Sequence, residues 1–492
     1  MYVIGIDIGT SSTKGVLTDL SGNVLSHQRY YHQVEHPNPG WAEQDADAVW
    51  WGETVKIIRD LLAHADVSAD RIAAIGCSGI CPVVLPIDAA GKPLRNAILY
   101  SIDSRAIKQI QALNDKVGAD AVFRSGQPLA TQSVMPKLMW LRENEPEVWS
   151  RTSRILGSSG YLAFRLCGEM TADPFTASDG GYGYLARSCK WDSEAFAAAD
   201  IDMDVMPKLC WPTEIAGYVH AAAARETGLR EGTPVIVGTG DALSEMLSTG
   251  IGEIGETAIL YGSSVTTMTI LDRPWYHEGF ITTPGWAPGI VLTSAILGSG
   301  TRILSWWSQL RGQAMDDDIF HSFEREAAAI DIGADGLIAL PYLTGMRSPF
   351  VDSGLRGALL GLADHHRSGH IVRALMEGIG YALRHALESL PVNGKIRAVG
   401  GGAKSELLVQ IVSDVCRLPQ EIVSGSVGAP LGSAWLAGAG AGLLAPASYM
   451  KWVGTQKRIM PQTSHAGQYD TVYSRFLTYL NAVRELHTHR RR

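Results

Sequence analysis

Long apolar runs, paired cysteines and an excess of basic residues are all missing from this 492-residue sequence. No run of about 18 uncharged apolar residues occurs, so we expect no membrane-spanning helix. The longest candidate, LGSAWLAGAGAGLLAPA, is rich in Gly and Ala, which is typical of a tightly packed helix. The formal net charge of −8 argues against a nucleic-acid partner. The chain opens directly on a strand-like segment, so we also expect no signal peptide.

The cysteines exclude two further classes of protein. Cys77 and Cys81 have three residues between them, and no second pair follows at zinc-binding spacing, so we expect no metal–thiolate site. The chain has the size and composition of a reduced cytosolic enzyme, so we expect no disulfides and a cytoplasmic location. The six cysteines are scattered over the sequence: Cys77, Cys81, Cys167, Cys189, Cys210 and Cys416.

The remaining composition is that of a globular α/β protein with more than one domain. Apolar residues make up 46% and charged residues 19%, and the length favours two domains. The opening YVIGIDIGTSSTKGVL, a strand, a polar turn and a return strand, resembles ETAILYGSSVTTMTIL at residues 256–271 in plan. This indicates an internal duplication with a boundary near residues 240–255. We therefore divide the chain into residues 1–245 and 246–492.

The first polar turn interrupts an apolar strand with a charge. Asp7 follows Ile6, and Gly9, Thr10 and Ser11 lead to Lys14. Backbone N–H groups, hydroxyls and a lysine could bind a phosphate, while a carboxylate could bind Mg²⁺. A β-hairpin whose aspartate is satisfied by backbone amides fits the same residues, and the P-loop pattern is absent.

A second aspartate follows another buried strand, in VIVGTGDALSEM. A dinucleotide fingerprint is incomplete here, because Leu243 occupies the position of its third glycine. Asp241 could cap the helix that follows or act as a general base. Glu245 lies on the same face of that helix, where a solvated or paired carboxylate is the ordinary alternative.

Two further segments contain many turn residues. A strand and a helix are separated by Gly400, Gly401 and Gly402. Three glycines let a ligand approach the backbone closely, but they also fit a tight strand-to-helix turn with no ligand. The segment 340–362 shows no spacing typical of chemistry and is interpreted as a structural loop.

Taken in order, these motifs resemble the FGGY carbohydrate kinases over nearly the whole chain. The match rests on a series of segments: GIDIGTSSTKGVL, GWAEQDADAVWW, AILYSIDSRA, MPKLMWL, GYLAFRLCGEMTADPFTAS, VGTGDA, LYGSSV, PYLTGMRSPFVDSGLRGALLGL, EGIGYAL and VGGGAKSELLVQIVSDV.

The resemblance implies a fold and a set of roles. The fold would be a duplicated actin-like ATPase (ribonuclease H-like) fold of class α/β with a cleft between its domains. Asp241 would take a proton from the sugar hydroxyl and bind Mg²⁺ together with Asp7. The ATP-binding residues would be Thr10, Ser11, Lys14, Gly262, Ser263, Gly401, Gly402 and Ser405.

The resemblance also implies substrate contacts, and at some of these positions this chain differs from the xylulokinases. The xylulokinases of this family carry Gln-Met-His-Gly where this chain has Gly79-Ile80-Cys81-Pro82, and Asn where it has Ala242. Each lost polar group could remove a hydrogen bond worth about 0.5–1.5 kcal/mol. The expected substrate contacts are Ile80, Cys81, Asp103, Arg105, Asp241 and Glu245.

The function expected from the resemblance is ATP- and Mg²⁺-dependent phosphorylation of a small carbohydrate. The acceptor stays open among a ketose such as D-xylulose, a sugar acid such as gluconate, and a polyol. A non-catalytic sugar sensor on the same fold is the alternative from another class, and a dinucleotide oxidoreductase is a weaker one. The expected partners are the sugar and ATP, without nucleic acid or membrane, and the assembly stays open to a homodimer.

Overall fold

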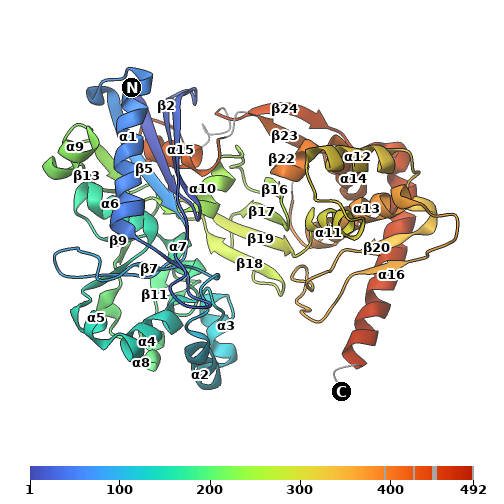
Figure 1. Cartoon of the computed structure of the whole chain (residues 1–492), viewed down its shortest axis with the longest axis horizontal. Helices are drawn as coiled ribbons and strands as arrows, with labels where there is room; N and C mark the ends of the chain where they lie inside the picture. Colours follow the sequence, from blue (N-terminus) through green and yellow to red (C-terminus); the bar gives the residue numbers. More distant parts are fainter. Residues whose placement is uncertain (393–394, 425–426, 446–451, 490–492) are drawn as a thin grey trace.

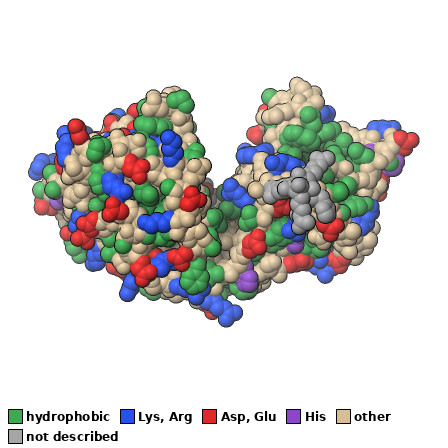
Figure 2. Space-filling view, turned by 90° about the horizontal axis from the view of Figure 1, so that it is seen from below, with side chains coloured by type: hydrophobic (Ala, Val, Ile, Leu, Met, Phe, Trp, Pro, Cys, Tyr) green, Lys and Arg blue, Asp and Glu red, His purple; other side chains and the backbone are tan. Residues whose placement is uncertain are grey.

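The structure, a computed structural model, contains two seven-stranded sheets that form two lobes side by side (Figure 1). It describes residues 1–392, 395–424, 427–445 and 452–489. Viewed from below, the molecule is hollowed between the lobes (Figure 2). Within the described residues we find no helix that has both the length and the apolar character needed to cross a bilayer.

The first sheet has the order β13-β14-β5-β1-β2-β3, with β15 paired to β5. Its strands are β1 (Tyr2–Ile8), β2 (Ser12–Asp19), β3 (Val24–Tyr31), β5 (Ile72–Gly79), β13 (Ile215–Tyr218), β14 (Pro234–Ile236) and β15 (Thr239–Gly240). The helices of this part of the chain are α1 (Gly52–Ala65), α2 (Ile107–Val117), α3 (Ala119–Ser125), α4 (Val134–Asn144), α5 (Pro146–Arg151), α6 (Ser158–Cys167), α7 (Pro174–Asp179), α8 (Ser193–Ala199), α9 (Ala221–Thr227) and α10 (Asp241–Leu247).

The second sheet repeats the plan of the first, with the order β18-β19-β17-β16-β22-β23-β24. In both, the opening strand pairs antiparallel with the next strand and parallel with a later one: β1 with β2 and β5, β16 with β17 and β22. The predicted duplication is therefore present. The strands are β16 (Thr257–Tyr261), β17 (Val265–Leu271), β18 (Phe280–Pro284), β19 (Val291–Leu297), β22 (Ile396–Val399), β23 (Gln420–Ser424) and β24 (Gly454–Ile459). The helices are α11 (Arg302–Leu310), α12 (Asp317–Ala328), α13 (Ser368–Leu387), α14 (Glu406–Cys416), α15 (Ala429–Gly440) and α16 (Ala466–His489).

Short strand pairs lie outside both sheets. They are β4 (Glu43–Gln44) with β7 (Ala97–Ile98), β6 (Leu85–Ile87) with β8 (Arg154–Leu156), β9 (Thr171–Ala172) with β12 (Lys208–Leu209), β10 (Tyr184–Leu185) with β11 (Lys190–Trp191), and β20 (Ile338–Leu340) with β21 (Ala358–Leu360). The segment predicted as a structural loop, residues 340–362, runs between β20 and β21 and includes the latter.

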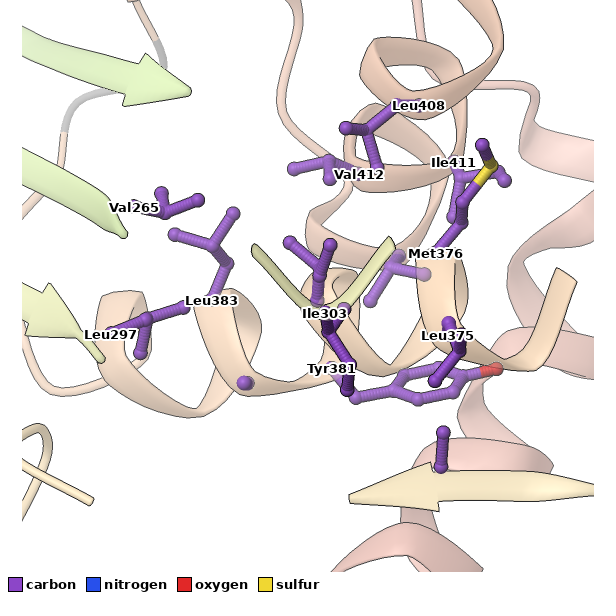
Figure 3. Packing of buried hydrophobic residues seen from close by; sticks show 14 of the residues in the cluster. Val265, Leu297, Ile303, Leu375, Met376, Tyr381, Leu383, Leu408, Ile411 and Val412 are labelled. Atoms are coloured by element: carbon purple, nitrogen blue, oxygen red, sulfur yellow. The ribbon is translucent and has the colours of Figure 1, made fainter. Parts of the chain in front are cut away.

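The core of the C-terminal lobe lies between its sheet and helices α13 and α14 (Figure 3). Val265 and Leu297 from the sheet meet Leu383 of α13 and Val412 of α14 there. Phe476 on α16 is fully buried in this cluster. The last described helix is thus a packing element of this lobe.

Helix α15 crosses from the second half of the sequence to the first sheet (Figure 1). Val3 of β1 packs with Leu431 and Trp435 of this helix in one core cluster. A Cβ atom placed on Gly5 would lie 1.9 Å from the carbonyl oxygen of Pro430, so only glycine permits this approach. The predicted domain boundary at residues 245/246 falls inside α10, and α15 belongs spatially with the first sheet.

Candidate active site

Asp7 lies near the end of β1, between two neighbouring strands of the first sheet. Its register partners are Lys14 on β2 and Ser78 on β5. The Ser78 hydroxyl donates to Asp7 Oδ1 at 2.8 Å, and Lys14 Nζ lies 3.7 Å from Oδ2. Burial raises the pKa of Asp7, and the positive charge of Lys14 opposes that rise. In the part of the chain that the structure describes, side chains and not backbone amides are the partners of this carboxylate.

The polar turn after Asp7 is held from outside by two side chains. The Thr10 hydroxyl lies 2.9 Å from the hydroxyl of Tyr100, and the Gln44 amide donates to the Thr10 carbonyl at 2.9 Å. Ser11 at the tip is exposed, and the Lys14 side chain is partly exposed. The structure thus brings Thr10, Ser11 and Lys14 together beside Asp7, as predicted.

Asp241 reaches the same end of the sheet from the other side of β5. Thr239 on β15 pairs with Ser78, the residue that Asp7 faces across β5, and Asp241 begins α10 two residues later. Burial raises the pKa of Asp241 well above its usual range, and the negative charge of Asp7 is the next cause. Its Oδ1 accepts a hydrogen bond from the Ala242 amide at 2.8 Å. The two predicted carboxylates therefore lie close enough to repel each other.

The Cys81 side chain lies next to Gly240, directly before Asp241, whereas the Ile80 side chain points into the hydrophobic core. A Cβ atom on Gly240 would lie 2.3 Å from Cys81 Sγ, so glycine is needed directly before Asp241. The Cys81 thiol donates to Asp179 at 3.8 Å. The Ile80 side chain is buried in the hydrophobic core, and the backbone of Ile80 bonds to β1 and α6.

Asp179 is a residue that the sequence reasoning missed. It ends α7, directly after the stretch whose resemblance was recognised up to Ser178. Burial raises the pKa of Asp179 to about 7, and the charge of Asp173 adds to the rise. A second aspartate at the end of that motif was the pattern that could have identified it.

Asp103 and Arg105 form an ion pair with each other and also contact Glu43 and the Ala42 amide. The guanidinium of Arg105 donates from Nη2 to Asp103 Oδ2 at 2.7 Å and contacts Glu43 at 2.8 Å. The Ala42 amide also donates to Asp103. The side chains of Asp103 and Arg105 are both fully shielded from water. Arg105 stacks on Trp41 and Trp140. Among the described residues Arg105 Nη1 is buried without a hydrogen-bond partner, so the role of this pair as substrate contacts stays a prediction.

Glycine turns line a cavity of about 340 Å³ in the C-terminal lobe. Gly262 and Ser263 follow β16, and Gly401 and Gly402 follow β22, so the two parallel strands bring both turns to one edge. Lys404 also lines this cavity. The predicted ATP-binding glycines are therefore neighbours.

A second cavity of about 520 Å³ lies against the same segment and reaches the first lobe. Gly400, Lys404 and Lys457 line it from one side and Glu245 from the other. Glu245 Oε2 accepts a hydrogen bond from the Ala429 amide at 2.8 Å, at the start of α15. Burial raises the pKa of Glu245, and the negative charge of Asp7 adds to the rise, so this carboxylate lies between the Asp7 site and the cavity. Its contact with the substrate stays a prediction.

Ser405 does not line either cavity. Its buried hydroxyl donates to Glu324 at 2.5 Å and accepts from the Leu408 amide, so it caps α14. Capping is the ordinary role of serine directly before a helix, and the contact of Ser405 with the nucleotide stays a prediction.

Both halves of the chain match known domains. Residues 2–248 match the N-terminal domain, and residues 257–441 the C-terminal domain, of the FGGY family of carbohydrate kinases. A xylulose kinase of Lactococcus lactis is 30% identical over 454 residues, covering 90% of this chain and 88% of its own. The structure of xylulose kinase from Rhodospirillum rubrum superposes with a TM-score of 0.92 at 28% identity, covering 99% of this chain and 100% of its own. Gluconate kinase from Lactobacillus acidophilus has a TM-score of 0.87 at 25% identity, with 98% of each chain covered.

Proposed function

This chain belongs to the FGGY family of carbohydrate kinases and phosphorylates a sugar with ATP, and from that premise we propose how it does so. The acceptor is a ketose such as D-xylulose, or a related sugar acid or polyol. Asp241 is the general base, and Asp7 and Asp241 hold Mg²⁺. The observation that carries the proposal is the register around Ser78: Asp7 pairs with it from β1, and Thr239, two residues before Asp241, pairs with it from β15.

The donor set fits a divalent cation. Asp7 is buried and Asp241 is half-buried, the pKa of each is raised, and the charge of Asp7 adds to the rise at Asp241. Within the described residues no group of three or more His, Cys, Asp or Glu side chains could hold a metal ion. Mg²⁺ is commonly held by one or two carboxylates together with substrate phosphates, so two aspartates suffice. When bound, the ion offsets negative charge on the phosphates.

The protein groups supply positioning and proton transfer. Asp241 accepts the proton of the attacking hydroxyl, and its raised pKa makes it a stronger base than an ordinary aspartate. Ser11 and Lys14 bind phosphate from the first lobe, with Thr10 fixed by Tyr100. Gly262 and Ser263 bind phosphate from the second lobe, and Gly401 and Gly402 line the adenosine pocket. Closure of the hollow between the lobes excludes water from the transfer.

An ATP-consuming sugar kinase of this kind acts in the cytoplasm, and a homodimer stays an expectation. The alternative of a sugar sensor is disfavoured because a sensor needs neither a general base nor a second carboxylate beside it. The division of the chain into a sugar-binding half (1–245) and a nucleotide-binding half (246–492) is kept as part of the proposal.

A coupled assay of ADP release across ketoses, polyols and aldonates tests the proposal. We expect release with at least one of these acceptors, dependent on added Mg²⁺ and abolished by excess EDTA. Release that is equal with and without every sugar would contradict it, because the reaction would then be ATP hydrolysis.

The place of Glu245 gives a separate prediction. Glu245→Gln keeps an oxygen for the Ala429 amide but removes a negative charge from the cavity wall that carries Lys404 and Lys457. We expect the KM for ATP to fall by about two- to fivefold, the effect of a weak charge interaction, and the KM for the sugar to stay unchanged. Initial rates at varied ATP and varied sugar separate the two. A rise in the KM for the sugar alone would return Glu245 to the substrate site.

A further inference from the structure

The carboxylate of Asp179, the amide of Gln132 and the thiol of Cys81 form a cluster that the proposed reaction does not use; we call it the Asp179 cluster. Gln132 Nε2 donates to Asp179 Oδ1 at 2.6 Å, and Cys81 Sγ donates to Oδ2 at 3.8 Å. Asp179 is neither fully buried nor exposed. The cluster joins three segments that are far apart in the sequence, so it is a built feature of the fold.

The Asp179 cluster is fixed beside the proposed base. Asp173 caps the start of α7 and also accepts a hydrogen bond from the Thr239 hydroxyl at 2.8 Å, which ties this helix to β15. Cys81 fills the space next to Gly240, the residue before Asp241. The charge of Asp179 is among the causes that raise the pKa of Asp241. A sugar whose hydroxyl reaches Asp241 therefore passes close to Asp179.

The chemistry of the cluster is that of a hydrogen-bond acceptor. An ionised carboxylate only accepts, and it has about four lone-pair positions, of which Gln132 and Cys81 occupy two. The negative charge of Asp173 raises the pKa of Asp179, and Asp179 in turn raises the pKa of Asp241, so acidic groups surround this carboxylate. A hydroxyl donor satisfies such a site, whereas a second carboxylate is repelled by it.

We propose that Asp179 selects the substrate by accepting a hydrogen bond from a hydroxyl of an uncharged ketose or polyol, and that it excludes sugar acids. This inference rests on the proposed function, because it places the acceptor between Asp179 and Asp241. It narrows the substrate to a neutral class, and Cys81 supports the carboxylate instead of contacting the sugar through a polar group of its own.

The experiment compares wild type with Asp179→Asn, using D-xylulose and ribitol as neutral probes and D-gluconate as the acid probe. Binding is measured by calorimetry, and turnover by ADP release. Wild type is expected to bind a neutral probe more tightly than gluconate. Loss of a charged hydrogen bond in the variant weakens neutral binding by about tenfold or more and removes most of the discrimination.

Matched controls separate selection from damage to the fold. Asp70→Asn makes the same change at an exposed residue before β5 and should leave the preference unchanged. Asp179→Ser is a second variant in case the asparagine variant unfolds, and thermal denaturation is measured for each. A preference that is unaltered in both Asp179 variants, a wild-type preference for gluconate, or a lack of neutral-sugar binding would each overturn the inference.

The pH profile provides a readout that a structural role would not change. Since the pKa of Asp179 is about 7, its charge is lost as the pH falls below that value, and exclusion of gluconate should weaken between pH 8 and pH 6. Asp173, Asp241 and Cys81 face the same region, and burial raises the pKa of each. Taking the ratio of neutral to acid affinity at each pH cancels changes common to both probes. A ratio that depends equally on pH in Asp179→Asn would contradict the assignment, and binding without ADP release would count against the proposed kinase activity alone.

Discussion

Asp241→Asn is expected to lower kcat for sugar phosphorylation by about 10²–10⁴-fold, the range for loss of a positioned general base. The variant keeps an oxygen that can accept the Ala242 amide, so the start of α10 is preserved. It also removes one of two repelling carboxylates, so the free energy of unfolding should not fall. ADP release at saturating ATP and sugar measures the loss, and thermal denaturation checks the fold.

The control for this experiment is the binding of sugar measured without turnover. The affinity of the variant for the best acceptor should stay within about tenfold of wild type, because one hydrogen bond at most is weakened. A variant that binds sugar and retains kcat close to wild type would show that Asp241 is not the base. The sugar-sensor alternative would then regain support, since it requires binding and no proton transfer.

The carboxylate pair was predicted from the family resemblance, and the sheet explains why the two residues share one edge. Asp7 lies near the end of one strand and Asp241 follows another, and strands that run parallel in one sheet present their ends at the same edge. The glycine turns at Gly262 and Gly401 were assigned from the same resemblance, and they follow neighbouring parallel strands. The residues alone left a satisfied hairpin and a helix cap open as alternatives at the two aspartates.

The contacts of Asp103, Ser405 and Asp179 could not be predicted, because they depend on which side chain faces which partner. Asp103 is bonded to the Ala42 amide 61 residues away, and Ser405 to Glu324 81 residues away. Asp179 meets Gln132 and Cys81 only after α7 has been docked on β15. Motif order indicates that such residues are near a site, but not whether their polar atoms are already satisfied.

Helix α15 shows the same limit at the level of the fold. Its small residues predicted tight packing, which is confirmed, but its partner was not predictable from local pattern. The contact with Gly5 joins residues more than four hundred positions apart, and the boundary chosen at residues 245/246 cuts through α10. Helix α15 belongs to the second half of the sequence but packs on the sheet of the first half, which the apolar pattern alone does not show.

Arg105→Met is expected to lower the free energy of unfolding of the N-terminal lobe by about 3–5 kcal/mol, because it removes the ion-pair partner of the buried Asp103 and leaves Glu43 with Arg95 alone. Asp103 is fully shielded and Glu43 nearly so, and both contact this guanidinium. Trp41 and Trp140 lie 4.1 and 5.0 Å from its central carbon, so tryptophan fluorescence during urea denaturation should report the loss.

A matched arginine separates this effect from the general loss of an ion pair. Arg142 pairs with Asp200 at 3.0 Å, but that aspartate is 94% exposed, so Arg142→Met should cost at most about 1 kcal/mol. Because a two-lobed chain need not unfold in one step, the fluorescence transition is compared with far-UV circular dichroism in each variant. If Arg105→Met left stability unchanged and instead raised the KM for the sugar, the pair would belong to the substrate site and not to the scaffold. The role that the family resemblance implies for Asp103 and Arg105, contact with the substrate, would then be supported.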